Sequence, residues 1–394
     1  MTNQEIISMG DAYVMPTYGR FPVAFEKGQG ATLTDFDGKT YVDFASGIGV
    51  NSLGYGYTPW VEAVSRQAAA LQHISNLYYS APMAQVAKTL TERTGMADVF
   101  FANGGGESNE GMIKLARKYS FDKYGMGRST IVTLRQSFHG RTISTLAATG
   151  QDVFHNYFFP FTQGFTYAVA NDVESVKAAC TPDVCAVMME LIQGEGGVLP
   201  LEQEFVQQVA EFCKEHDLLL LIDEVQTGVG RTGSLFCFQQ YGIQPDAVSF
   251  AKGIAGGLPF GGVMANAKCA QVLGPGTHAT TFGGNPVAAA GACVVLDTLD
   301  DAFLQTVEEK GAYIRETVAG WQLPVVTGVR GKGLMVGIGV TCSHKAAVSA
   351  CLSGGLLALT AGSDTIRLLP PLNISYEEIN AGLQILKTVL EGIA

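Results

Sequence analysis

Short apolar runs alternate with stretches of helical spacing from residue 97 to residue 264. The runs cover residues 97–102, 131–134, 184–190, 218–223, 246–251 and 260–264. Apolar runs of this length, separated by helices, are typical of buried strands in a sheet that helices cover on both faces. Because strands that alternate with helices tend to pair in parallel, the pattern predicts an α/β fold with a mostly parallel sheet wrapped by helices.

The two ends of the chain differ from this middle part. Residues 1–50 contain short strands and turns, with a hairpin signal at Asp37-Gly38, and residues 286–394 mix helical stretches with further strands. A chain of 394 residues is too long for one ordinary core. We therefore expect a large domain over residues 51–285 and a smaller α+β domain that residues 1–50 and 286–394 build together.

Two of the predicted strands end in a charged residue. Lys252 follows the run 246–251, and Asp223 ends the run 218–223. Desolvation beside apolar surface lowers the pKa of a lysine, and an uncharged amine can form a Schiff base with a carbonyl. A lone lysine at a strand end more often reaches water. The buried carboxylate that ends the preceding strand is what favours a reactive amine here.

Further residues with chemical potential follow the ends of the other strands. They are the turn Asn103-Gly104-Gly105-Gly106-Glu107, Phe138, Arg141, Glu195 and Gln226. A glycine turn before a helix exposes N–H groups that bind phosphate, and arginine can hold a carboxylate. Taken alone, each has an ordinary alternative as a flexible turn, a core aromatic or a surface ion pair. Because ligands of such sheets bind at the carboxyl ends of the strands, their coincidence predicts a site at that edge.

Composition disfavours several other classes of protein. The formal charge of −11 argues against nucleic acids and anionic membranes as partners. No apolar run approaches the roughly 20 residues that span a bilayer, and the first residues lack the pattern of a secretory signal. The 8 cysteines are scattered without metal-ligand spacing. We therefore expect a cytoplasmic protein with reduced thiols and no metal site.

The residues at the strand ends together suit pyridoxal 5'-phosphate, which needs an amine, an acid, an anion site and an aromatic platform. Lys252 would bind its aldehyde, and Asp223 would keep the ring nitrogen protonated. The ring would lie between Phe138 and Val225. The remaining predicted contacts are those of Gln226 with the ring hydroxyl and of the N–H groups of Gly105 and Gly106 with the phosphate.

Longer motifs indicate a known family. They are Ser137-Phe-His-Gly-Arg-Thr142, Gln193-Gly-Glu-Gly-Gly197, Asp223-Glu-Val-Gln226, Gly230-Arg-Thr-Gly233, Lys252-Gly253 and Thr281-Phe-Gly-Gly-Asn-Pro286. With the flanking segments 18–24 and 366–372, the likeness extends nearly end to end. The chain resembles the class III, fold type I, pyridoxal-phosphate aminotransferases, and among them it is most similar to members that act on N-acetylornithine.

The resemblance implies a reaction and the residues that bind its substrates. The terminal amine of N-acetylornithine would pass to 2-oxoglutarate, giving N-acetylglutamate 5-semialdehyde and glutamate, as in arginine biosynthesis. Arg367 would bind the α-carboxylate of glutamate or 2-oxoglutarate, and Glu195 would neutralise it when the donor brings no carboxylate there. Arg141 would bind the carboxylate at the far end of either substrate, with Tyr18 assisting.

The resemblance also implies a homodimer with each active site at the subunit interface. Thr281 would reach across to the partner subunit's cofactor phosphate. Thr280, where the family usually has serine, would lie near the substrate. The turn 103–107 departs from the usual Asn-Ser-Gly-Thr/Ala-Glu, because it has three glycines in the middle. A hydroxyl is lost while the backbone donors remain, so we expect a weaker phosphate site that still binds.

Three alternatives stay open. Ornithine, succinylornithine and 4-aminobutyrate also present a terminal amine, so each of them fits as donor. A nucleotide-binding dehydrogenase would share the sheet, although no G-x-G-x-x-G follows a strand with an acid about 20 residues further on. An inactive relative that only binds ligands would share the fold, and the presence of both Asp223 and Lys252 argues against it.

Overall fold

The computed structural model describes residues 1–393, and its centre is a sheet of seven strands in the order β4-β12-β11-β10-β7-β5-β6. The strands are β4 Asp98–Ala102, β5 Thr130–Leu134, β6 Phe165–Ala168, β7 Val184–Met189, β10 Leu219–Asp223, β11 Ala247–Phe250 and β12 Gly261–Ala265. Strands β6, β5, β7, β10 and β11 pair in parallel, whereas β12 is antiparallel to both of its neighbours. The predicted α/β fold with a mostly parallel sheet is confirmed.

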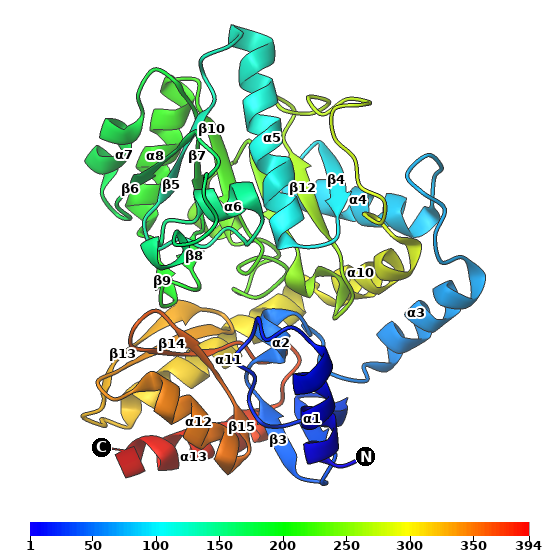
Figure 1. Ribbon diagram of the computed structural model, residues 1–394, viewed down its shortest axis with the longest axis vertical. Helices are drawn as coiled ribbons and strands as arrows, with labels where there is room; N and C mark the ends of the chain where they lie inside the picture. Colours follow the sequence, from blue (N-terminus) through cyan, green and yellow to red (C-terminus); the bar gives the residue numbers. More distant parts are fainter. Residues whose placement is uncertain (394) are drawn as a thin grey trace.

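Helices cover both faces of this sheet, and Figure 1 shows α5 across one of them. The helices of this part are α3 Thr58–Ala70, α4 Ala81–Thr94, α5 Gly105–Tyr124, α6 Ile143–Ala148, α7 Val173–Ala179, α8 Gln203–Glu215, α9 Phe238–Tyr241 and α10 Pro286–Thr298. Side chains alternate between the faces of a strand. In β10, Leu219 and Leu221 therefore pack in one cluster with residues of α5, while Leu220 and Ile222 pack in another with residues of α8.

The two ends of the chain meet in a smaller part, drawn below the central sheet in Figure 1. One sheet has the order β1-β2-β3-β15 and the other β13-β14-β17-β16. The strands are β1 Phe25–Gln29, β2 Thr32–Asp35, β3 Thr40–Asp43, β13 Val326–Lys332, β14 Met335–Val340, β15 Leu356–Leu357, β16 Leu359–Ala361 and β17 Thr365–Leu368, and the helices are α11 Asp301–Gly320, α12 His344–Gly354 and α13 Tyr376–Ile393. The division at residues 50 and 285 stays a prediction, which the pairing of β3 with β15 supports.

The N-terminal segment holds a helix that the sequence analysis missed. Residues 1–50 were expected to form only short strands and turns, yet α1 covers Asn3–Tyr13. Its start is a capping box, in which the Thr2 side chain accepts from the Glu5 N–H and the Glu5 carboxylate accepts from the Thr2 N–H. The pattern Thr-x-x-Glu is the sequence signal that predicts such a start.

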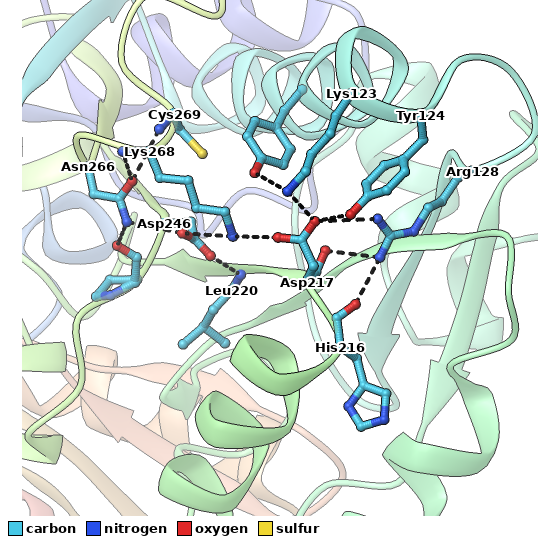
Figure 2. Close-up of polar contacts among 12 residues, drawn as sticks. Lys123, Tyr124, Arg128, His216, Asp217, Leu220, Asp246, Asn266, Lys268 and Cys269 are labelled. Carbon is cyan, nitrogen blue, oxygen red and sulfur yellow. Dashed lines mark hydrogen bonds and ion pairs between the residues drawn. The ribbon is translucent and has the colours of Figure 1, made fainter.

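The amino ends of the parallel strands carry a network of charges, shown in Figure 2. Asp217, just before β10, accepts hydrogen bonds from Lys123, at 2.7 Å, and from Tyr124. Lys268 lies 3.5 Å from Asp217 and 3.6 Å from Asp246, just before β11. These contacts tie the end of α5 and the segment after β12 to the turns that precede β10 and β11, so this edge serves stability.

The variant Asp217→Asn tests this network. Partial burial raises the pKa of Asp217, but the hydrogen bonds from Lys123 and Tyr124 and the charge of Lys268 outweigh it and hold the pKa at about 2. Because the folded pKa lies below the ordinary value of about 3.9, ionised Asp217 stabilises the fold above pH 4. We expect the variant to lose about 1 kcal/mol of unfolding free energy at pH 7, after allowance for its partial exposure.

Thermal unfolding between pH 7 and pH 2 measures this effect. The difference between wild type and Asp217→Asn should shrink as the pH falls from 4 toward 2, where the native carboxylate takes up a proton. A difference that is constant with pH would contradict the role given to the charge of Asp217.

Candidate active site

The carboxyl ends of the strands border a cavity of about 220 Å³. Eight of the residues predicted from the sequence line it, namely Gly105, Gly106, Phe138, Glu195, Asp223, Val225, Gln226 and Lys252. They come from segments more than a hundred residues apart, which the parallel strands bring to one edge of the sheet. Asn109, His139, Gly140 and Glu190 complete the lining.

Lys252 stands at the end of the strand β11, as predicted. It begins the short 3-10 helix η2 Lys252–Ala255 and has a left-handed backbone with φ +46°. Such a conformation is strained for a residue with a side chain and is found at functional sites. Burial lowers the pKa of Lys252 to about 8, and the charge of Arg367 adds to this effect. A useful fraction of the amine is therefore uncharged near neutral pH, as a nucleophile requires.

Asp223 ends β10 with its carboxylate inside the protein, 4 % exposed. Its Oδ2 accepts from the Asn109 side-chain amide at 2.7 Å and lies 2.8 Å from Nδ1 of His139. Its Oδ1 accepts from the Val225 N–H at 3.0 Å. Hydrogen bonds from several donors replace the water that a buried carboxylate has lost. The structure thus holds an acidic side chain in the lining of the cavity. It also places His139, for which no partner was predicted, in contact with this acid.

The glycine turn opens the start of α5 toward the cavity. Gly104 precedes the helix, and no side chain caps the helix start. A Cβ atom added to Gly105 would lie 2.6 Å from Cγ1 of Val225, so position 105 tolerates only glycine. A Cβ added to Gly104 would meet nothing within 4 Å. Free N–H groups at the positive end of a 20-residue helix suit a phosphate group, so this turn fits the anionic end of the expected cofactor.

Aromatic side chains stand at one wall of the cavity. Phe138 donates its N–H to Oε1 of the buried Glu190 at 2.8 Å. Its ring meets Phe154 edge to face, with centroids 5.8 Å apart. The guanidinium of Arg141 lies 4.2 Å from the centroid of Phe154 and 5.5 Å from that of Phe138. Phe154, in the short helix η1 Asp152–Phe154, was not predicted, and it gives Arg141 a cation–π contact that fixes its direction.

Glu195 and Arg367 form an ion pair at the opposite side. Nη1 of Arg367, in β17, lies 2.6 Å from Oε1 of Glu195 and 3.1 Å from Oε1 of Gln226. Arg367 is 2 % exposed. Burial raises the pKa of Glu195, but the charge of Arg367 outweighs it and holds the pKa below its ordinary value. The amide oxygen of Gln226, predicted to face a ring hydroxyl, here accepts from Arg367.

The motif Gly230–Gly233 lies outside the cavity and ties the two parts of the chain together. Arg231 is 3 % exposed, and its guanidinium donates to the backbone oxygens of Leu334 and Pro370. Both acceptors belong to the smaller part, close to β14 and β17. The motif therefore helps to hold Arg367 against the large sheet.

Five predicted residues do not line the cavity of the single chain, namely Arg141 and Arg367, described above, and Tyr18, Thr280 and Thr281. Tyr18 is 75 % exposed, with the guanidinium of Arg20 5.7 Å from its ring centroid. The hydroxyl of Thr280 accepts from the Asn103 side chain at 3.2 Å. Thr281 lies beside it in a surface hollow that Tyr78 also lines. Their predicted roles near the substrate and at a partner's cofactor stay predictions.

The described residues show neither a metal cluster nor a membrane helix. Within residues 1–393, no three or more His, Cys, Asp and Glu side chains gather as metal ligands would. In the same range, no helix is both long enough and apolar enough to cross a bilayer.

The chain is similar to known aminotransferases along its whole length. The family described as "Aminotransferase class-III" matches residues 13–390. The acetylornithine aminotransferase of Haemophilus ducreyi is 49% identical over 99% of both chains. Two solved structures are also similar. The N-acetylornithine aminotransferase of Stenotrophomonas maltophilia superposes with a TM-score of 0.84 at 36% identity, over 98% of each chain.

The second structure is the ornithine aminotransferase of Toxoplasma gondii, which has partial occupancy of PLP at its active site. It superposes with a TM-score of 0.94 at 29% identity, over 100% of this chain and 95% of that one. The match to the family model and the full-length relatives agree with the fold. The chain belongs to the class-III aminotransferases.

Proposed function

We propose that the protein is a pyridoxal-phosphate-dependent acetylornithine aminotransferase, which moves the terminal amine of N-acetylornithine to 2-oxoglutarate. The observation that carries this proposal is that Lys252, Asp223 and the glycine turn, which the sequence separates, line one cavity. The donor is inferred from the names of relatives such as that of Haemophilus ducreyi, 49% identical. The proposal includes a place in arginine biosynthesis in the cytoplasm.

The cavity fits the cofactor at each of its ends. Asp223 would accept a hydrogen bond from the protonated ring nitrogen, and the helix start at Gly105 and Gly106 would bind the phosphate. Phe138 and Val225 would contact the two faces of the ring, and Gln226 its hydroxyl. When bound, the cofactor withdraws electrons from the substrate carbon that carries the amine.

Lys252 would act on the substrate through its amine. Lys252 would first hold the aldehyde end of the cofactor, and the incoming substrate amine would displace it. The freed Nζ would then take the proton from the substrate carbon that carries the nitrogen, as a general base. A pKa of about 8 leaves enough uncharged amine for this role.

Arg367 and Glu195 would let one site accept two kinds of substrate. Glutamate and 2-oxoglutarate would place their α-carboxylate on Arg367 and displace Glu195. N-acetylornithine reacts through its distal amine and brings no carboxylate to this point, so the 2.6 Å pair with Glu195 would persist. A buried arginine without a partner would be costly, which is the physical reason for the exchange.

Arg141 would bind the carboxylate at the far end of either substrate. It is exposed and lies over the rings of Phe154 and of Phe138, which lines the cavity. Tyr18 and Thr280 would contact the substrate nearby. This carboxylate is the α-carboxylate of N-acetylornithine and the distal carboxylate of 2-oxoglutarate.

A homodimer would complete the site. Tyr78, Tyr79 and Phe282 are 68%, 97% and 60% exposed, and such large apolar groups together favour a protein interface. Tyr78 and Thr281 line the same hollow. In a dimer formed through this surface, Thr281 would reach the partner subunit's cofactor phosphate.

A panel of amine donors tests the proposed activity. With 2-oxoglutarate as acceptor, kcat/KM should be at least about tenfold higher for N-acetylornithine than for ornithine, succinylornithine or 4-aminobutyrate, with ping-pong kinetics. Lys252→Ala should lower kcat by about 10³-fold or more. Lys310→Ala is the matched control, because burial also lowers the pKa of this lysine, which does not line the cavity. Preference for ornithine would instead favour the activity of the Toxoplasma gondii protein.

Glu195→Gln separates the two half-reactions. With N-acetylornithine, Arg367 would lack its anion, and kcat/KM should fall about 10²-fold. With glutamate, whose own carboxylate pairs with Arg367, the loss should stay below about tenfold. Single-turnover rates for each substrate measure this, with the exposed Glu202→Gln as control. Equal losses in both half-reactions would remove the exchange from the mechanism.

Arg141→Ala tests the far-end carboxylate. We expect kcat/KM for N-acetylornithine to fall about 10²-fold, because a charge-assisted pair is lost, and the loss for 1,4-diaminobutane, which has no carboxylate, to stay below about threefold. For Arg141→Lys, kcat/KM for N-acetylornithine should lie between the values for wild type and Arg141→Ala, because lysine keeps the charge and lacks the planar guanidinium. A similar loss with the diamine would show that Arg141 acts in some other way.

A further inference from the structure

We propose that Asn109 is a positioning residue that sets the spacing between the phosphate-binding turn and Asp223. The inference rests on the proposed cofactor site and adds a residue to it. Asn109 lies in the second turn of α5, the helix whose first residues, Gly105 and Gly106, form the turn. It is 1 % exposed, and it lines the same cavity.

The side-chain amide of Asn109 links two loops at the strand ends. Its Nδ2 donates to Oδ2 of Asp223 at 2.7 Å and to the backbone oxygen of His139 at 2.7 Å. Both hydrogens of the amide are therefore used, one in the bond to the Asp223 carboxylate and one in the bond to the backbone of His139. His139 in turn places Nδ1 2.8 Å from Oδ2 of Asp223, so the three residues form one closed unit.

The neighbouring residue in α5 fixes the strand that carries Lys252. The hydroxyl of Ser108 lies 2.9 Å from the backbone oxygen of Phe250, the last residue of β11, and 3.0 Å from that of Gly104. Two consecutive side chains of one helix thus contact the ends of β10 and β11. The turn itself follows β4, which is separated from β10 by two strands.

The helix therefore acts as a rigid spacer. Residues three and four apart lie on the same side of a helix, about one turn of 5.4 Å along its axis. Gly105 and Gly106 are four and three residues before Asn109. Because α5 lies across the sheet (Figure 1), its first two turns determine how far the N–H groups of the turn stand from Asp223. Without Asn109, that distance would depend on the packing of the sheet and on the contact of Ser108 with Phe250.

The amide of Asn109 contributes through its donors. Its Oδ1 is buried and has no hydrogen-bond partner among the described residues. An unsatisfied buried oxygen destabilises the fold, so a side chain that served packing alone would do better without it. The two donated hydrogen bonds are what this residue adds to the site.

The test compares two ligands of the apoenzyme. Asn109→Ala should raise the Kd for pyridoxal 5'-phosphate about tenfold or more, because Asp223 and the turn are no longer held in register. The Kd for inorganic phosphate should stay within about twofold, because the turn itself is unchanged. In the variant saturated with cofactor, kcat should fall while KM for N-acetylornithine stays constant, since Arg141 and Arg367 are not touched.

Two further variants guard against a general loss of folding. Asn109→Leu has nearly the same size and removes both donors without adding a charge, and it should weaken cofactor binding at least as much as Asn109→Ala. Asn266→Ala is the matched control at the opposite edge of the sheet (Figure 2). There the Asn266 amide also donates to a backbone oxygen, that of Pro245 at 3.3 Å, and to an aspartate, Asp246 at 3.0 Å. This control should lower thermal stability and leave both Kd values unchanged.

The outcomes separate this inference from the proposed function. Kd for pyridoxal 5'-phosphate within twofold of wild type in both Asn109 variants would overturn the positioning role. So would an equal loss of affinity for cofactor and inorganic phosphate. A wild-type protein that does not bind the cofactor at all would instead overturn the proposed function.

Discussion

A carboxylate inside a protein is stable only if the protein replaces the water it has lost, and the site depends on how Asp223 meets this condition. Its donors come from the helix α5, from the loop that contains His139 and from its own backbone at Val225. Asn109 is fixed by the helix α5, whereas His139 and Val225 lie in the loops that follow β5 and β10. The acid therefore has one position, and the residues that supply the donors are held in the same geometry.

The two edges of the central sheet use charge in different ways. At the amino ends of the strands, Asp217, Lys268 and Asp246 neutralise one another and connect the surrounding turns. At the carboxyl ends, Lys252 and Asp223 line a cavity and keep groups available for a ligand. The parallel arrangement is the reason for this separation, since it collects all strand ends of one kind on one side. The contacts that stabilise the fold and the groups that suit chemistry therefore lie at opposite edges of the sheet.

The pair of Arg367 and Glu195 joins the smaller part of the chain to this cavity. Arg367 lies in β17, and Glu195 follows the short strand β8 Ile192–Gln193 of the large part. Arg231 supports this contact by donating hydrogen bonds to backbone oxygens near β14 and β17. A buried ion pair adds little net stability, because both charges lose their hydration. Under the proposed function, its value in this place is that a carboxylate of a substrate would take the position of Glu195.

The sequence alone determined six of the seven strands of the large sheet and the residues at their ends, whereas β6 Phe165–Ala168 was missed. A strand buried on both faces must be apolar throughout, and this requirement is local, so the runs that end at Asp223 and Lys252 could be recognised without knowledge of their neighbours. The glycine turn before α5 was predictable for the same reason. The capping box at Thr2 was an equally local signal, although the helix it starts was missed.

Only the tertiary structure decided which of these residues meet. Asn109 and Asp223 are 114 positions apart, and Glu195 and Arg367 are 172 apart. Their contacts depend on the strand order and on how α5 lies across the sheet. Neither feature produces a periodic pattern in the sequence. Phe154 was missed because a single aromatic residue in a three-residue helix has no pattern around it. Long-range packing, which the whole chain sets at once, is the physical reason that these partners could not be predicted residue by residue.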